Sequence, residues 1–191
     1  MRMLVIALTL VLGLSAAHAE DKITPVKLGE AFPDLTLKTT DGKDVTIIGL
    51  QKGAREGEHI PMLLVIWCSS CSCCREIDAT LEKLVKDYKG KAAIVVVSSN
   101  KAETPEKVAA MQKRMAMTFP VYLDPKAEVA DYLGAKVTTS AVVLDGEGNV
   151  KYRGSFVKRG QNFAADALAA VVEGKKPESE ETPFSGCPIE R

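Results

Sequence analysis

Four of the five cysteines lie in one short stretch, Cys68-Ser69-Ser70-Cys71-Ser72-Cys73-Cys74, and the fifth is Cys187. The stretch contains two overlapping C-x-x-C pairs, Cys68 with Cys71 and Cys71 with Cys74. In disulfide exchange the thiolate is the nucleophile, and a second thiol nearby can expel it from a mixed disulfide. The spacing therefore indicates thiol–disulfide chemistry, with Cys71 common to both pairs.

The cysteine stretch lies between a predicted strand and a predicted helix. Residues 62–66 form a continuous apolar run, which is typical of a strand buried on both faces of a sheet. Apolar residues then recur at helical spacing from Ile77 to Tyr88, and Gly90 follows as a helix terminator. Because a helix N-terminus lowers the pKa of a nearby thiol, this junction favours a reactive cysteine.

The helical rotation separates the thiols by their expected accessibility. At about 100° per residue, Cys74 lies near the apolar face of the helix and Cys71 lies at its edge. We therefore expect an exposed Cys71 to attack and a buried Cys74 to resolve the mixed disulfide. Cys68 is expected to be a third redox or ligand partner, and Cys73 a semi-buried bystander.

The rest of the chain alternates strands and helices. Apolar–polar alternation around Asp41-Gly42 predicts an opening hairpin, and a second hairpin is expected around residues 145–148. The other expected elements are a strand at 92–97, a helix from Thr104 to about Met115, a strand at 120–123, a short helix ending at Gly134 and a helix at 164–173. This order predicts an α/β sandwich of three layers, with a mixed central sheet and helices on both faces.

The two ends of the chain differ in composition from its middle. Arg2, the apolar run at residues 4–14 and Ala17-His18-Ala19 predict a signal peptide at 1–19, hence a periplasmic or secreted protein without a membrane anchor. Residues 20–174 are expected to form one domain. Residues 175–191 are rich in Lys, Pro, Glu and Ser, which predicts a charged tail that does not order itself.

Charge and histidine content exclude some function classes. The 25 Lys and Arg residues balance 25 Asp and Glu residues, which gives no indication of a nucleic-acid partner. His59 is the only histidine beyond the predicted signal peptide and falls in a loop, so a His-dependent nucleophile has little support. Because the number of cysteines is odd, at least one thiol of a monomer stays free, pairs between chains or binds another group.

The cysteine stretch and its flanks resemble the active site of the TlpA/redoxin branch of the thioredoxin superfamily, which is related to AhpC/TSA proteins. Ile66-Trp67 is followed by Cys71-Ser72-Cys73-Cys74-Arg75 and then by Leu81-Glu82-Lys83-Leu84, without a gap. The resemblance extends to the hairpins at 29–48 and 142–154. It implies a thioredoxin-like fold with an N-terminal hairpin and an exported thiol–disulfide oxidoreductase, with Cys71 as nucleophile and Cys74 as resolving thiol. Its implied partners are protein thiols or disulfides and an upstream redox donor.

The chain departs from that family pattern at two places. Trp67 and Cys68 also fit the Trp-Cys-x-x-Cys pattern of thioredoxin itself, so a register three residues earlier stays open. The proline that usually faces the cysteine pair is replaced by Thr139. We expect Trp67, Thr138 and Thr139 to lie on the side that faces a substrate.

The missing proline keeps a second class of function open, because in the family this residue limits the access of metals. The alternative is a metal-binding protein for copper(I), zinc or an iron–sulfur cluster, with Cys68, Cys71, Cys74 and Cys187 as thiolate ligands. The oxidoreductase itself needs no cofactor beyond its redox-active disulfide. A thiol peroxidase is less favoured, because the Pro-x-x-x-Thr-x-x-Cys pattern of peroxiredoxins is absent.

The C-terminal segment adds a possible resolving cysteine. Gly186-Cys187-Pro188-Ile189 resembles the tail of exported redoxin-like proteins. The extended chain from Gly174 to Cys187 spans up to about 43 Å, which is enough to reach the start of the predicted helix. Cys187 is therefore expected either to resolve or regulate the site or to remain a free thiol.

Overall fold

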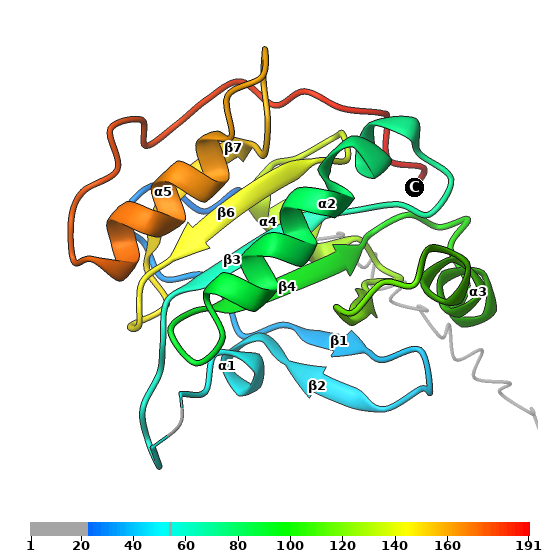
Figure 1. Cartoon of the computed structure of the whole chain (residues 1–191), viewed down its shortest axis with the longest axis horizontal. Coiled ribbons are helices and arrows are strands. Elements are labelled where there is room, and N and C mark those ends of the chain that lie inside the picture. Colours follow the sequence, from blue (N-terminus) through cyan, green and yellow to red (C-terminus); the bar gives the residue numbers. More distant parts are fainter. Residues whose placement is uncertain (1–22, 54) are drawn as a thin grey trace, which may run out of the picture.

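The computed structural model describes residues 23–53 and 55–191, which form a mixed sheet between two layers of helices (Figure 1). The predicted α/β sandwich and its N-terminal hairpin are confirmed. The predicted signal peptide lies outside the described residues. No helix within those described ranges has the length and apolar character needed to cross a bilayer.

The strands are β1 (Thr36–Lys38), β2 (Asp44–Thr46), β3 (Met62–Ile66), β4 (Ala93–Ser98), β5 (Val121–Leu123), β6 (Ser140–Leu144) and β7 (Val150–Ser155). The helices are α1 (Ile47–Leu50), α2 (Ser72–Asp87), α3 (Pro105–Met115), α4 (Glu128–Leu133) and α5 (Phe163–Val172).

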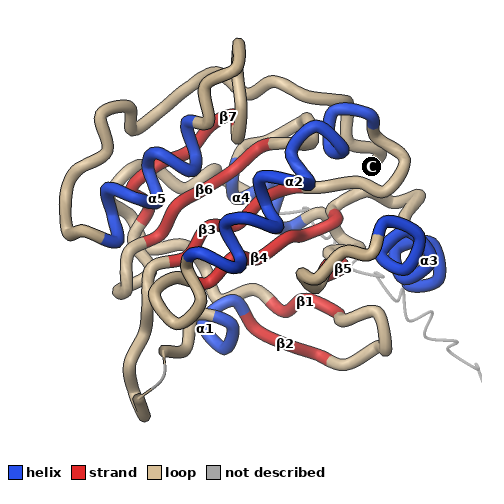
Figure 2. Tube along the Cα trace, in the orientation of Figure 1, coloured by secondary structure: helices blue, strands red, loops and turns tan. Residues whose placement is uncertain are grey.

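The sheet has the order β2-β1-β5-β4-β3-β6-β7 and encloses a core on each face. The side chains of β3 are fully buried and alternate between the two faces. Leu63 and Val65 pack with α2, α3 and α5, and Figure 2 shows α2 and α5 in front of the sheet. Met62, Leu64 and Ile66 pack with α1 and α4 on the opposite face. The continuous apolar run therefore forms a central strand, as its pattern predicts.

The pairing of β3 with its neighbours determines which loop lies beside the cysteines. β3 is parallel to β4 and antiparallel to β6, with Val65 opposite Ala141. The start of β6 consequently lies beside the end of β3, where the N–H of Thr139 donates to the carbonyl of Ile66 over 2.7 Å. Residues 137–139 are thereby held beside the chain that leads from β3 into α2.

The C-terminal segment differs from the expectation of a tail that does not order itself. It runs along β7, the edge strand, and returns to the start of α2 (Figure 1). The N–H of Arg153 donates to the carbonyl of Glu180 over 2.9 Å, and the N–H of Thr182 donates back to Arg153 over 3.1 Å. The physical reason is that the edge strand offers unpaired backbone groups and Ile189 buries its side chain against the core around α4.

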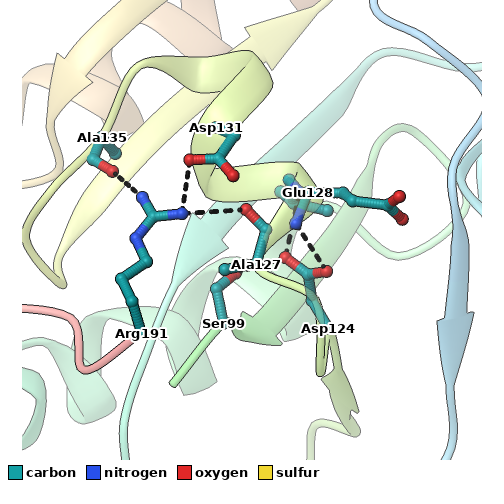
Figure 3. Close-up of polar contacts among 8 residues, drawn as sticks. Ser99, Asp124, Ala127, Glu128, Asp131, Ala135 and Arg191 are labelled. Atoms are coloured by element: carbon teal, nitrogen blue, oxygen red, sulfur yellow. Dashed lines mark hydrogen bonds and ion pairs between the residues drawn. The ribbon is translucent and has the colours of Figure 1, made fainter. Parts of the chain in front are cut away.

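The last residue of the chain fixes the end of this segment to α4 (Figure 3). The guanidinium of Arg191 donates to the carbonyl of Ala135 over 3.0 Å and forms an ion pair with Asp131. The helix itself begins at Glu128, four residues after Asp124. The carboxylate of Asp124 accepts hydrogen bonds from the N–H groups of Glu128 and Val129 and so satisfies two donors of the first helical turn.

Candidate redox site

Three sulfur atoms meet at the N-terminus of α2. Cys71 is the N-cap residue of this helix, and Cys73 and Cys74 lie in its first turn. The sulfurs of Cys71, Cys73 and Cys74 all lie within 4.8 Å of one another. The later C-x-x-C pair, Cys71 with Cys74, is thus brought together at the strand-to-helix junction.

Cys73 is the residue whose surroundings the sequence pattern least indicates. It is half-buried, and its sulfur lies 3.4 Å from that of Cys71 and 2.8 Å from that of Cys187. The N–H of Cys187 also donates to the Cys73 sulfur over 3.3 Å. Cys73 therefore lies between the C-x-x-C pair and the tail cysteine, where a bystander was expected. We call these four residues, Cys71, Cys73, Cys74 and Cys187, the sulfur cluster.

Cys71 and Cys74 differ less in exposure than the helical rotation suggests. Cys74 is fully buried, as expected, and the N–H of Cys68 donates to its sulfur over 3.3 Å. Cys71 is only 9% exposed, so the expectation of an exposed Cys71 is wrong. The reason is tertiary: the hydroxyl of Thr138 lies 3.4 Å from the Cys71 sulfur, and the 137–139 loop and the tail cover this end of the helix.

The surroundings shift the thiol pKa values in different directions. Burial raises the pKa of Cys71 to about 12 and raises the pKa of Cys74 still further. Burial also acts to raise the pKa of Cys73, but hydrogen bonds from Cys187, Thr138 and Cys71 outweigh it and hold that pKa below its usual value. Among Cys71, Cys73 and Cys74, Cys73 is consequently the thiol that ionises most readily.

Cys68 has separate surroundings. Its thiol donates to the carboxylate of Glu103 over 3.6 Å and lies 3.2 Å from the hydroxyl of Ser70, while the side-chain amide of Asn100 donates to its sulfur over 3.6 Å. Burial raises its pKa, and the nearby carboxylate raises it further. The Cys68 sulfur thus lies in a polar contact network and is not a member of the three-sulfur group, which contains only the later C-x-x-C pair. Glu103 precedes α3 and has no motif that indicates this contact.

The loop residues expected to face a substrate occupy different positions. Thr138 is fully buried, and its hydroxyl lies 3.4 Å from the sulfurs of both Cys71 and Cys73. Thr139 has a left-handed backbone with φ of 56°, and its hydroxyl donates to carbonyls of Thr138 and Ser185. Thr138 therefore contacts the cysteines, whereas Thr139 fixes the loop and the tail.

Trp67 connects the end of β3 to α2 and β4 through hydrogen bonds. Its ring is buried, and its indole N–H donates to the carboxylate of Asp78 over 2.9 Å. The N–H of Trp67 donates to the carbonyl of Val97 in β4 over 2.7 Å. These two bonds link the segment before the cysteines to α2 and to the sheet. The ring is only 1% exposed, where a position facing a substrate was expected.

The chain is similar to known proteins over about two thirds of its length. A family model described as the AhpC/TSA family matches residues 28–153. The thioredoxin-like protein YneN of Bacillus subtilis (strain 168) is 32% identical over 127 residues, which cover 66% of this chain and 70% of that protein.

Solved structures give the same picture of the fold. The crystal structure of the protein SMc02350 from Sinorhizobium meliloti 1021 has a TM-score of 0.74 and 28% identity, covering 87% of this chain and 95% of that one. A structure assigned as a thiol:disulfide interchange protein DsbE from Chlorobium tepidum has a TM-score of 0.63 and 19% identity, covering 77% and 98%. The second likeness concerns the thioredoxin-like fold alone.

Proposed function

Because the chain belongs to the AhpC/TSA family and has the thioredoxin-like fold, we propose that it is an exported thiol–disulfide oxidoreductase. The observation that carries the proposal is the meeting of the Cys71 and Cys74 sulfurs at the start of α2. Membership of the family supports thiol-dependent redox chemistry in general. The proposed substrates are protein thiols or disulfides, and an upstream redox donor returns the centre to its starting state.

In the reducing direction, Cys71 passes its proton to the Cys73 thiolate, 3.4 Å away, and attacks one sulfur of a substrate disulfide. A Cys71–substrate disulfide forms, and the other substrate sulfur leaves as a thiolate that takes a proton from water. Cys74 then attacks the Cys71 sulfur, and its proton passes to the second substrate sulfur, which leaves as a thiol. The substrate gains two electrons and two protons, and the protein is left with a Cys71–Cys74 disulfide.

Two further cysteines give this disulfide a route to the surface. The Cys73 thiolate, 3.4 Å from the Cys71 sulfur, attacks Cys71 and releases Cys74 as a thiol. Cys187 then attacks Cys73, releases Cys71 and leaves a Cys73–Cys187 disulfide between α2 and the tail. We assign the transfer to Cys187 because its sulfur adjoins Cys73, whereas the Cys68 thiol contacts Glu103. The upstream donor reduces this outer disulfide.

Export rests on residues 1–19, which have the pattern of a cleaved signal peptide. Peptide sequencing of the protein recovered from the periplasmic fraction or the culture medium tests this part. A mature chain that begins at Glu20 is the expected result. Recovery of the uncleaved chain from the cytosol alone would contradict it.

Insulin reduction and trapping of mixed disulfides test the chemistry. Cys71→Ser should abolish insulin reduction. The double variant Cys73→Ser/Cys74→Ser should accumulate a substrate disulfide on Cys71, because it lacks both thiols that can attack the Cys71 sulfur. Cys68→Ser is the matched control, since Cys68 lies in the same stretch and is buried to a similar extent. Undiminished activity of Cys71→Ser would exclude the assignment.

A further inference from the structure

The sulfur cluster has a composition that suits a soft metal ion. Within the described residues, the group of closely spaced ligand atoms at this site consists of cysteine sulfurs alone: Cys71, Cys73 and Cys74. Neither a histidine nor a carboxylate belongs to it. Thiolate-only sites select soft cations such as copper(I), and hard cations prefer oxygen ligands. The chemistry of the donor set therefore restricts the candidate ions.

The spacing of the sulfurs also suits a metal centre. With metal–thiolate bonds of about 2.3 Å, as for Zn–S, three sulfurs around one ion stand roughly 4 Å apart. The three sulfurs lie within 4.8 Å of one another, and the pair Cys71–Cys73 is at 3.4 Å. Small side-chain rotations are enough to place all three around a common centre. All three belong to one helix start, so the backbone that carries them is already rigid.

Neighbouring polar groups are placed to stabilise bound thiolates. The N–H of Cys68 donates to the Cys74 sulfur, and the N–H of Cys187 donates to the Cys73 sulfur, each over 3.3 Å. The hydroxyl of Thr138 lies 3.4 Å from the sulfurs of both Cys71 and Cys73. Hydrogen bonds to ligand atoms orient them and are a regular feature of metal sites.

From these observations we propose that Cys71, Cys73 and Cys74 bind one copper(I) ion. This ligand set replaces the set expected from the sequence, because Cys68 contacts Glu103 and Cys73 occupies the cluster. Copper(I) is favoured over zinc(II) because structural zinc sites require four ligands, whereas only three sulfurs of the described residues here lie within 4.8 Å of one another, and Cys187 is not among them. Cys187, 2.8 Å from Cys73, then covers the ion from the tail.

Copper(I) binding and formation of the Cys71–Cys74 disulfide exclude each other, because both use the same sulfurs. Copper(I) displaces the thiol protons of its ligands and is neither oxidised nor reduced in the process. A Cys71–Cys74 disulfide removes two of the three ligands, so only the reduced protein binds the ion. The inference does not depend on the proposed function, because metal binding is measured without any substrate and can fail or succeed independently of insulin reduction.

The test is anaerobic titration of the reduced, metal-free mature protein with copper(I) in competition with bicinchoninate. One copper(I) per chain and an X-ray absorption spectrum with sulfur neighbours only are the expected results. Cys73→Ser should weaken copper(I) affinity by more than about 100-fold, beyond the effect typical of residues outside the ligand set. Cys68→Ser should bind as the parent does, and Thr138→Val should lose about 10-fold.

Three results would overturn the inference. One is competition that leaves all copper(I) with bicinchoninate. Another is equal loss of affinity in Cys68→Ser and Cys73→Ser. The third is a preference for one zinc(II) ion with four sulfur neighbours. Because Cys74 is fully buried, Cys74→Ser is informative only if its circular dichroism and melting temperature match the parent. The half-buried Cys73 supplies the decisive variant.

Discussion

The sulfur of Cys187 lies 2.8 Å from the sulfur of Cys73, although 114 residues separate the two in the sequence. The contact depends on the path of the tail, because the carbonyl of Cys187 accepts a hydrogen bond from the N–H of Thr138 over 2.8 Å. It brings a tail cysteine onto the first turn of α2. The tail is therefore part of the candidate site, and several of its residues can be tested for that role.

Gly186 allows the tail to approach the 137–139 loop. A Cβ atom at this position would collide with the carbonyl of Thr138, and backbone cannot move aside as a flexible side chain can. We predict that Gly186→Ala slows formation of the Cys73–Cys187 disulfide by at least tenfold in a glutathione redox buffer, measured by mass spectrometry of quenched samples. A tenfold slower rate corresponds to an activation free energy that is higher by about 1.4 kcal/mol.

Ser185→Ala is the matched control for Gly186→Ala, because only the main-chain carbonyl of Ser185 is used, by the hydroxyl of Thr139. It should form the disulfide at the parent rate. Equal rates in the parent and Gly186→Ala would show that the close approach of the tail is not needed for the contact.

Arg191 fixes the end of the tail to α4 (Figure 3). Its guanidinium donates to the carbonyls of Ala127 and Ala135 and pairs with Asp131. We predict that Arg191→Ala increases the proteolysis rate of the tail severalfold and lowers the free energy of unfolding by about 1 kcal/mol, in the range of charged hydrogen bonds at a partly exposed site. Limited proteolysis and urea denaturation measure the two effects.

Lys176→Ala removes a surface ion pair with Glu180 in the same tail and serves as the control for Arg191→Ala. It should leave both measurements unchanged, since an exposed pair of this kind contributes little. A tail of the Arg191→Ala variant that is as resistant as the parent's would contradict the proposed anchoring.

Asp124 is expected to make the free energy of unfolding depend on pH. Burial raises its pKa above 3.8, although Ser99 and the N–H groups of Glu128 and Val129 donate to its carboxylate. A raised folded-state pKa means that the native protein holds the proton more tightly than the unfolded chain. The contribution of Asp124 to stability is therefore complete below pH 3.8 and decreases as the pH rises through its folded pKa.

Urea denaturation between pH 3 and pH 7 measures this effect. Asp124→Asn removes the titrating group and should flatten the corresponding part of the stability curve, whereas Asp44→Asn, at an exposed ion pair on β2, should not. A fall in the free energy of unfolding across this window that is as large in Asp124→Asn as in the parent would contradict the assignment.

The sequence pattern predicts the scaffold well because its signals are local. Residues 62–66 form a buried central strand, since a continuous apolar run of that length has few other solutions in an α/β protein. As expected, α3 begins after Thr104, its N-cap, and α4 ends at Gly134, which has a left-handed backbone. The helical rotation correctly places Cys74 in the core.

The arrangement around the cysteines depends on contacts that no local pattern contains. Cys71 is covered because Thr138 and the tail lie over it, and both come from distant parts of the chain. The contact of Cys73 with Cys187 requires the tail to follow β7, and the tail's charged composition gives no sign of this path. The separation of Cys68 from the cluster likewise depends on Glu103, 35 residues further along the chain.

Disulfide mapping of the mature protein tests the central claim most directly. The protein is equilibrated in oxidising and reducing glutathione buffers, alkylated and digested with trypsin, and its peptides are fragmented by electron transfer to distinguish neighbouring cysteines. The account predicts a Cys71–Cys74 disulfide, a tail peptide joined through Cys187 to Cys73, and an alkylated Cys68. A Cys68–Cys71 disulfide, or a tail peptide with free Cys187 under all oxidising conditions, would contradict it.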